Sequence, residues 1–136
     1  MDIVIKQISA TQCLPIRQKV LWPDRNLGHS MVPEDDQGLH FGAYAEDNLT
    51  CVASVFIANN EARLRKFAIL PAYQLRGIGT QILHHIIEQM VSRNVSKLWC
   101  DARKSAIDFY ARFGFTKEGD LFFKHGVPYV KMVAGL

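Results

Sequence analysis

Short runs of apolar residues predict the elements of the first 38 positions. Residues 3–5 (IVI) form a β-branched run that suits a strand, and apolar residues then recur at helical spacing between positions 14 and 21. Thr11 is a candidate N-terminal cap for that helix. Residues 22–38 hold two prolines, two glycines and an acidic cluster at 34–36. We therefore expect an irregular or partly helical connection, of a kind that is often functional.

Alternating apolar and polar positions predict three strands in the middle of the chain. Residues 40–45 and 51–58 flank a polar turn at 46–48 and are typical of a hairpin. After this hairpin, residues 62–70 (ARLRKFAIL) become wholly apolar toward their end, which predicts a strand that is buried there on both faces. Pro71 ends this strand.

The second half of the chain combines two helices with three further strands. Apolar residues at 78, 82, 83, 86, 87 and 90 predict an amphipathic helix that ends near Arg93. We expect a strand at 97–100, a short helix at 105–113, and two strands at 115–123 and 127–133. The order β-α-β-β-β-α-β-α-β-β predicts an α/β protein whose mixed sheet carries helices on its faces.

Length and composition favour one domain, residues 1–136. At 136 residues, 49% of them hydrophobic, the chain can form a core without disulfides or structural metals. Cys13, Cys51 and Cys100 lie far apart and include no CxxC pair, so we expect buried thiols in a reducing compartment and no metal site. The chain begins MDIVIKQ, without a signal-peptide pattern, and holds no apolar run of the ~20 residues that a membrane span needs. A cytoplasmic protein with no membrane partner is therefore expected.

Charge is distributed unevenly along the chain, which has a formal net charge of +3. Residues 1–60 hold four Lys/Arg and seven Asp/Glu, a net −3, whereas residues 61–136 hold twelve and six, a net +6. The second part is the expected host for an anionic ligand. The alternative is a chance difference between two solvated surfaces.

A glycine-rich loop, residues 74–80, joins the strand at 62–70 to the long helix and reads QLRGIGT. Glycines allow a ligand to approach the main chain, and the first amides of a helix, which have no internal acceptor, form an anion site. The loop is no P-loop, because no lysine follows its second glycine. Ile82 stands where a dinucleotide-binding fingerprint needs its third glycine. A turn that binds nothing is the remaining alternative.

Two motifs within residues 62–133 can be compared with known families. The loop contains Gln74-x-x-Gly77-x-Gly79, and residues 102–115 read ARKSAIDFYARFGF. These stretches resemble the Gln/Arg-x-x-Gly-x-Gly/Ala and Asn-x-x-Ala-x-x-Phe-Tyr-x-x-x-Gly-Phe motifs of the GNAT superfamily of N-acetyltransferases. The resemblance implies a GNAT acyl-CoA N-acyltransferase fold, with a roughly seven-stranded mixed sheet flanked by helices. It also implies acetyl-CoA as the cosubstrate.

The resemblance further implies which residues bind this cosubstrate. The backbone of Phe67, Ala68 and Ile69 would pair with the pantetheine arm like an added strand, and one free amide there would bind the thioester oxygen. Ser105 replaces an asparagine that often caps the following helix and touches the pantetheine, so we expect a weaker contact from it. The pyrophosphate would lie on the loop, at Gln74, Leu75, Arg76, Gly77, Ile78, Gly79 and Thr80.

Tyr110 is the candidate catalytic residue, because it lies where the family often places a tyrosine that protonates the leaving thiolate. A phenol is protonated at neutral pH, as a general acid must be. The alternative is a purely structural position, because Ala106, Phe109, Tyr110 and Phe113 form a helical stripe that suits a core.

The group that takes the proton of the attacking amine is left open. Arg63 stands where some family members carry a catalytic glutamate, which leaves water, Glu61 or the segment 34–40 for this role. His84 and His85 are neighbours on a helix and point about 100° apart, so they cannot share a metal ion.

The leading hypothesis for function is an N-acetyltransferase in which a primary amine attacks acetyl-CoA directly within a ternary complex. An acyl-enzyme intermediate is not required, because the sequence shows no Cys-His or Ser-His arrangement near the loop that would argue for one. A non-catalytic acyl-CoA-binding module of the same fold is the alternative. A third reading, single-stranded nucleic-acid binding by Phe122, Phe123 and Tyr129, is not preferred, and we expect no nucleic-acid partner.

The amine acceptor is not identified by the sequence. The acidic cluster at 34–36 could attract a cationic amine, or its side chains could simply be solvated. We also predict a possible homodimer, through an edge that the C-terminal strand could supply.

Overall fold

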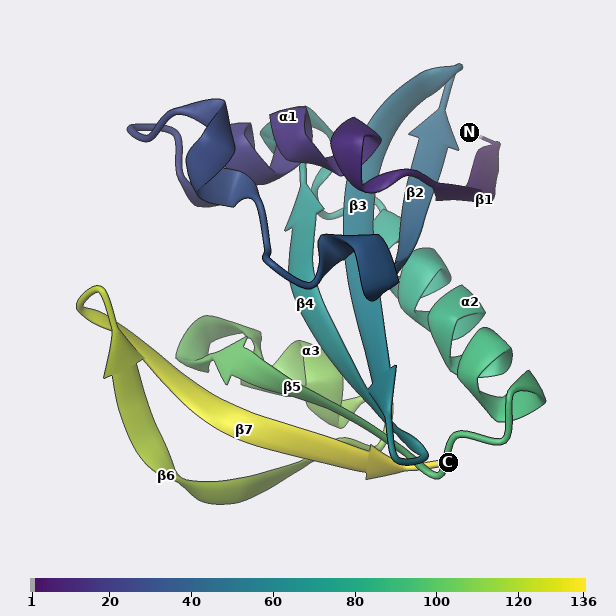
Figure 1. Cartoon of the computed structure of the whole chain (residues 1–136), viewed down its shortest axis with the longest axis vertical. Coiled ribbons are helices and arrows are strands. Elements are labelled where there is room, and N and C mark those ends of the chain that lie inside the picture. Colours follow the sequence, from purple (N-terminus) through teal and green to yellow (C-terminus); the bar gives the residue numbers. More distant parts are fainter. Residues whose placement is uncertain (1) are drawn as a thin grey trace.

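The computed structural model describes residues 2–136, which form one seven-stranded sheet with three α-helices in the predicted order (Figure 1). The helices are α1 (Ala10–Leu21), α2 (Ile78–Ser92) and α3 (Ile107–Ala111), and short 3-10 helices lie at Leu27–Ser30, Asp35–Gln37, Pro71–Tyr73 and Lys104–Ala106. The strands are β1 (Ile3–Ile8), β2 (Leu39–Ala45), β3 (Asn48–Ala58), β4 (Glu61–Ile69), β5 (Lys97–Arg103), β6 (Thr116–Lys124) and β7 (Val127–Gly135).

The sheet has the strand order β1-β2-β3-β4-β5-β7-β6, and all neighbours are antiparallel except β4 and β5. This parallel pair is joined only where residues 61–63 lie opposite residues 97–99. Beyond Arg63 the two strands diverge, β4 toward α1 and β5 toward the β6–β7 turn (Figure 1). The sheet is mixed, as predicted, and it is open in its middle.

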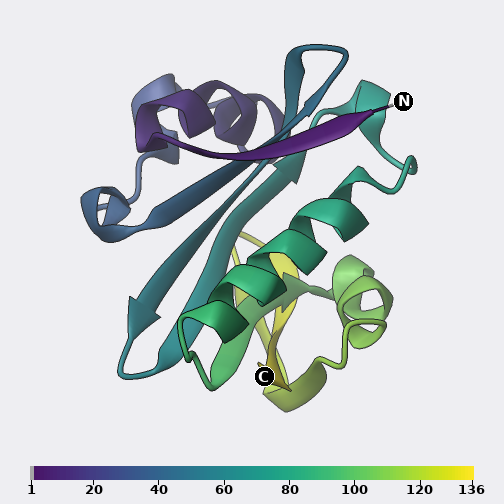
Figure 2. The same ribbon diagram turned by 90° about the vertical axis from the view of Figure 1, so that its right-hand side faces the viewer.

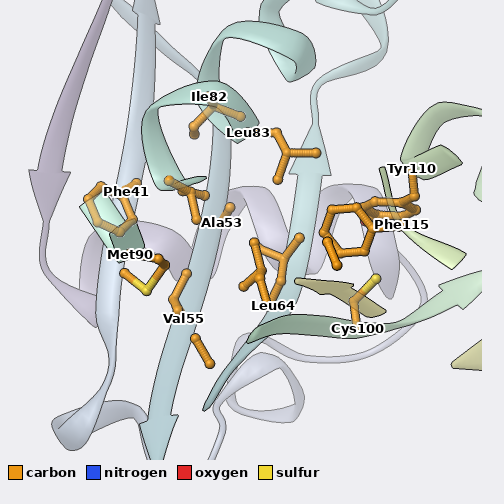
Figure 3. Packing of buried hydrophobic residues seen from close by; sticks show 14 of the residues in the cluster. Phe41, Ala53, Val55, Leu64, Ile82, Leu83, Met90, Cys100, Tyr110 and Phe115 are labelled. Atoms are coloured by element: carbon orange, nitrogen blue, oxygen red, sulfur yellow. The ribbon is translucent and has the colours of Figure 1, made fainter. Parts of the chain in front are cut away.

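Helices cover both faces of the sheet (Figure 2). α2 and α3 cover the larger core, where Leu83 and Met90 of α2 point toward Val55 and Leu64 of the strands (Figure 3). α1 packs on the opposite face in a smaller cluster around Cys13. The three cysteines are free and buried, as predicted. None of the helices in residues 2–136 combines the length and the apolar character that crossing a membrane requires.

Two local predictions were wrong. Ser9, not Thr11, caps α1: the Ser9 hydroxyl accepts from the Gln12 amide, and the Gln12 side chain accepts from the Ser9 amide. This reciprocal pair is a capping box, whereas Thr11 already lies in the first turn. The C-terminal strand β7 lies between β5 and β6, so it offers no free edge. The outer edge on that side is β6, which is almost entirely exposed.

A buried polar network fixes the connection between α1 and β2. Arg17 is fully buried and donates to both carboxylate oxygens of Asp35, at 2.8 and 3.0 Å, and to the Ser54 hydroxyl at 2.8 Å. His40 Nε2 lies 2.8 Å from the carbonyl oxygen of Asp35, which can only accept, so this nitrogen carries the hydrogen. Its Nδ1 lies 2.7 Å from the Ser54 hydroxyl. The predicted irregular segment 22–38 is thus held against α1 and β3.

Candidate active site

The diverging strands leave one edge of β4 without a partner. The Leu70 amide donates to the Thr50 carbonyl at 2.9 Å, toward β3. Backbone groups alternate along a strand, so those of Phe67 and Ile69 point the other way, into the opening between β4 and β5. These are two of the three residues that we expected to pair with an extended ligand.

A β-bulge interrupts β4 beside this edge. Arg65 pairs with Ser54 and Ala68 pairs with Val52, so that Lys66 and Phe67 together oppose Ala53. Lys66 has a φ of 56°, which is left-handed. In a regular strand, consecutive side chains point to opposite faces of the sheet. The extra residue breaks this alternation, and the consecutive residues Arg65 and Lys66 both line one cavity.

The glycine loop lies at the end of β4. The Gln74 side chain donates to the Ile69 carbonyl at 3.1 Å and so attaches the loop to the strand. Within residues 2–136, no hydrogen bond uses the backbone amides of 75–80, and no side chain caps α2. Free amides at the start of a 15-residue helix attract an anion, and binding of the acyl donor's phosphates at this loop stays a prediction.

The two glycines of the loop serve different needs. Gly77 begins α2 with a φ of 79°, a left-handed conformation that side chains with a Cβ rarely adopt. Gly79 allows close packing, because an added Cβ would lie 3.0 Å from Ile69 Cδ1, which would have to shift, and 3.5 Å from Phe67 Cζ. Leu75 is fully exposed, and the guanidinium of Arg76 lies 5.6 Å from the Tyr73 ring centroid.

A cavity of about 370 Å³ occupies the opening between β4 and β5. It runs from the unpaired edge of β4 to the end of α1 and the β6–β7 turn. Its walls come from both halves of the chain and consist of Leu21, Trp22, Arg63, Leu64, Arg65, Lys66, Phe67, Cys100, Asp101, Arg103, Ala106, Tyr110, Lys124, His125 and Tyr129.

Tyr110 belongs to the cavity wall and to the core at once. Its side chain is 8% exposed and packs on Phe115, with ring centroids 5.4 Å apart, while Cys100 lies close by (Figure 3). Burial raises the pKa of the Tyr110 phenol well above its usual range, and the hydrogen bond that it donates to Cys100 adds to this effect. Burial likewise raises the pKa of the Cys100 thiol to about 12. Both groups are therefore neutral at physiological pH.

Asp101 is the only carboxylate on the cavity wall within residues 2–136, and sequence reasoning missed it as a site residue. Its Oδ2 accepts from Arg63 at 2.9 Å and from Lys124 at 3.0 Å. The Arg63 guanidinium also lies 4.7 Å from the ring centroid of Trp99. Arg63 stands where some family members carry a catalytic glutamate. This position therefore holds a cation, which is paired with Asp101 of β5.

Trp22, Lys124, His125 and Tyr129 are further wall residues that sequence reasoning did not select for acetyl transfer. They come from the end of α1 and from the β6–β7 hairpin, which lie about one hundred positions apart. No local motif marks them, and only the sheet topology brings them together.

Several residues considered from the sequence lie away from the cavity. Glu61 lies where β4 and β5 are still paired, and Asp35 is bound to Arg17. Ser105 is exposed and makes no capping hydrogen bond, and its expected contact with the pantetheine stays a prediction. His84 contacts Phe113 and His85 contacts Phe41, and no group of His, Cys, Asp or Glu within residues 2–136 could hold a metal ion.

The unpaired strand edge, with a helix N-terminus at its end, defines the class of protein, an acyl-CoA N-acyltransferase fold. Residues 18–136 match the acetyltransferase (GNAT) domain family. The chain belongs to this family of acyltransferases, which uses acetyl-CoA, and the resemblance noted in the sequence is confirmed.

Individual relatives agree with this assignment. The chain is 25% identical to the uncharacterized N-acetyltransferase YitI of Bacillus subtilis, over 87% of this chain and 85% of YitI. It is 31% identical to the ribosomal protein bS18-alanine N-acetyltransferase of Salmonella typhimurium, over 62% of this chain and 59% of that protein. A GNAT family acetyltransferase from Elizabethkingia anophelis, crystallised with acetyl-CoA bound, superposes with a TM-score of 0.77 at 15% identity and covers 98% of each chain.

Proposed function

We propose that this protein transfers the acetyl group of acetyl-CoA to a primary amine by direct attack within a ternary complex. The observation that carries the proposal is the unpaired edge of β4, which ends beside the free amides at the start of α2. An extended, uncharged arm with a phosphate group at one end fits this arrangement, because the edge offers strand-like hydrogen bonds and the amides attract the anion. The acetyl-CoA bound in the relative from Elizabethkingia anophelis supports it.

In this proposal, the backbone of Phe67 and Ile69 holds the acyl donor, and the amides of 75–80 hold its pyrophosphate. One N–H of the free edge also donates to the thioester oxygen, where negative charge develops as the amine nitrogen attacks. A carbon–nitrogen bond forms and the carbon–sulfur bond breaks. Arg76 adds a positive charge to the loop, but the main chain supplies most of the phosphate contact.

Tyr110 is the proposed general acid. Tyr110 lies on the cavity wall and its phenol is neutral, so it has a proton to give to the departing thiolate. Its present acceptor is the Cys100 thiol, which is itself neutral and a weak acceptor. A thiolate is a much stronger acceptor, so the phenol donates to it when it forms.

His125 is proposed to take the proton that the amine loses. Within residues 2–136 it is the one imidazole on the cavity wall, and the one carboxylate there, Asp101, is already shared by two cations. Neither Glu61 nor the segment 34–40, which were considered from the sequence, reaches the cavity.

An acceptor screen tests the proposal. The protein is mixed with acetyl-CoA and a panel of amines, and the release of free thiol is compared with the acetylated product by mass spectrometry. For at least one amine, we expect the amount of free thiol released to equal the amount of acetylated amine formed. Tight binding of acetyl-CoA without thiol release for any amine would favour the alternative, a non-catalytic acyl-CoA-binding module.

A further inference from the structure

The cavity wall carries many more positive charges than negative ones. Five cationic side chains, Arg63, Arg65, Lys66, Arg103 and Lys124, face a single carboxylate, Asp101. A cationic acceptor such as a polyamine would be repelled from this wall. The acidic cluster at 34–36 offsets little of this repulsion, because Asp35 is bound to Arg17, Glu34 reaches only Arg65, and none of the three residues lines the cavity.

Partners within the protein account for only part of this charge. Arg63 and Lys124 share Asp101, at 2.9 and 3.0 Å. Arg65 lies 3.6 Å from Glu34, whose side chain is 56% exposed, so solvent weakens this pair. Across residues 2–136, neither Lys66 nor Arg103 forms an ion pair.

Two of the cations are also poorly solvated. Lys66 and Arg65 are both half-buried and follow one another at the β-bulge. Burial lowers the pKa of Lys66, and the neighbouring charge of Arg65 lowers it further. Burial and the charge of Arg63 lower the pKa of Arg65 in the same way. An anion placed between these side chains would relieve their mutual repulsion.

The phosphates of the acyl donor do not fill this role. The proposed site for its pyrophosphate is the start of α2, which lies outside the cavity. The arm that would enter the opening ends in an uncharged thioester. The excess positive charge on the α1 side of the opening therefore has no counterpart on the donor and is left for the acceptor.

We propose that Arg65 and Lys66 bind a carboxylate or phosphate group of the acceptor, so that the substrate is a small amine with an anionic group a few bonds from its nitrogen. This inference rests on the proposed function. The size of the cavity, about 370 Å³ including the space for the acetyl end of the donor, fits a molecule of amino-acid size.

Matched pairs of acceptors test the proposal. kcat/KM is measured for L-alanine against L-alaninamide and for 2-aminoethyl phosphate against ethanolamine. We expect kcat/KM to be at least tenfold higher for the anionic member of one pair. A preference in the first pair identifies a carboxylate as the group that is bound, and a preference in the second identifies a phosphate. Equal or better use of the neutral member in both pairs, or acetylation only of peptide N-termini, would overturn the proposal.

Lys66→Met and Arg65→Met should each reduce this preference at least fivefold, while the exposed control Lys117→Met in β6 should not. Circular dichroism identifies the variants that fold. If one of the two variants fails to fold, the other still tests the proposal. An unchanged preference in a folded variant would contradict the proposal.

A binding measurement separates this inference from the proposed function. Inorganic phosphate is titrated without acetyl-CoA, and the rise in melting temperature is compared between the natural protein and Lys66→Met. A smaller rise in the variant supports the anion site even when no amine is acetylated, whereas an equal rise argues against the site even when acetylation occurs. Phosphate bound at the start of α2 contributes equally to both proteins.

Discussion

The indole ring of Trp22 meets the imidazole ring of His125 edge to face, with ring centroids 4.8 Å apart. Trp22 directly follows α1, and His125 lies in the turn between β6 and β7. The Trp22 ring also packs against the ring of His29, in the connection after α1, with ring centroids 5.1 Å apart. The N-terminal helix and the C-terminal hairpin thus meet on the wall of the cavity, and together they shape the side where the acceptor is proposed to bind.

Replacing His125 separates its proposed chemistry from its backbone role. His125 has a φ of 51°, a conformation that asparagine tolerates well, so His125→Asn should keep the turn intact. We expect kcat/KM to fall about 10²-fold, because the group that takes the proton of the amine is lost. Trp22→Leu is the control: it removes the ring contact but keeps the imidazole, so kcat/KM should fall much less. An unchanged kcat/KM in His125→Asn would exclude His125 as the base.

Tyr110→Phe removes the hydroxyl and keeps the buried ring. We expect turnover to fall by about 10²–10⁴-fold with acetyl-CoA affinity unchanged, because only proton transfer to the thiolate is lost. The melting temperature should change little, since one hydrogen bond to sulfur is removed. Cys100→Ala, which takes away the sulfur but leaves the phenol, should retain turnover. Turnover near the natural level in Tyr110→Phe would assign this residue to the core alone.

The pH dependence of the Tyr110 variant provides a second check. Burial raises the pKa of this phenol far above its ordinary value, so the group stays protonated throughout the range in which the protein is assayed. Both proteins should therefore show a basic limb of the same shape. A limb present in the natural protein and absent from Tyr110→Phe would show that the phenol titrates in that range.

Gly77→Ala tests whether the loop binds the acyl donor through its backbone. The left-handed φ of 79° makes any side chain unfavourable, and we expect a loss of about 1 kcal/mol in stability together with a large loss of acetyl-CoA affinity. Gly114→Ala is a matched control, because its φ of 86° is equally strained but the residue lies outside the loop. Isothermal titration of both variants should show weakened binding in the first alone. Equal affinities would mean that the loop is only a turn.

The buried pair of Arg17 and Asp35 predicts a pH-dependent stability. Burial alone would raise the pKa of Asp35, but hydrogen bonds from Arg17 and Val32 outweigh this effect and lower it below its usual value. The pair therefore stabilises the fold above the unfolded-state pKa of about 3.9, and this contribution is lost as the pH falls through the folded-state pKa.

Asp35→Asn should consequently destabilise the protein by about 3–5 kcal/mol at neutral pH, because Arg17 is left buried without its counter-charge. The difference from the natural protein should shrink as the pH falls below about 4. Asp36→Asn makes the same change in net charge at an exposed neighbour and should have little effect. Thermal melts across this pH range measure both variants, and a difference that does not vary with pH would contradict the assignment.

The sequence predicted the parts of this protein that local physics determines. The apolar repeat of α2 predicted the helix, and the glycine loop before it indicated the family, because both patterns lie in residues close together in the chain. The start of α1 was misplaced by two residues, because Ser9 and Thr11 are both plausible caps and only the reciprocal bond with Gln12 decides between them.

The acceptor side of the site could not be predicted in the same way. Asp101, Lys124 and His125 reach the cavity through the strand order β5-β7-β6, which no local pattern encodes. The acidic residue Asp35 looked available for a ligand, but its partner Arg17 lies on a helix 18 positions earlier in the chain. The bulge that brings Arg65 and Lys66 to one cavity depends on pairing with β3 and is equally invisible in the sequence.

The divergence of β4 and β5 also affects how strongly the protein resists unfolding. Most sheets leave unpaired edges only at their outer strands, whereas this one has two inside the molecule. With acetyl-CoA bound there, as proposed, the missing hydrogen bonds are supplied by a metabolite. A ligand at about 100 times its dissociation constant adds about 2.7 kcal/mol to the free energy of unfolding. The free energy of unfolding would then rise and fall with the concentration of acetyl-CoA.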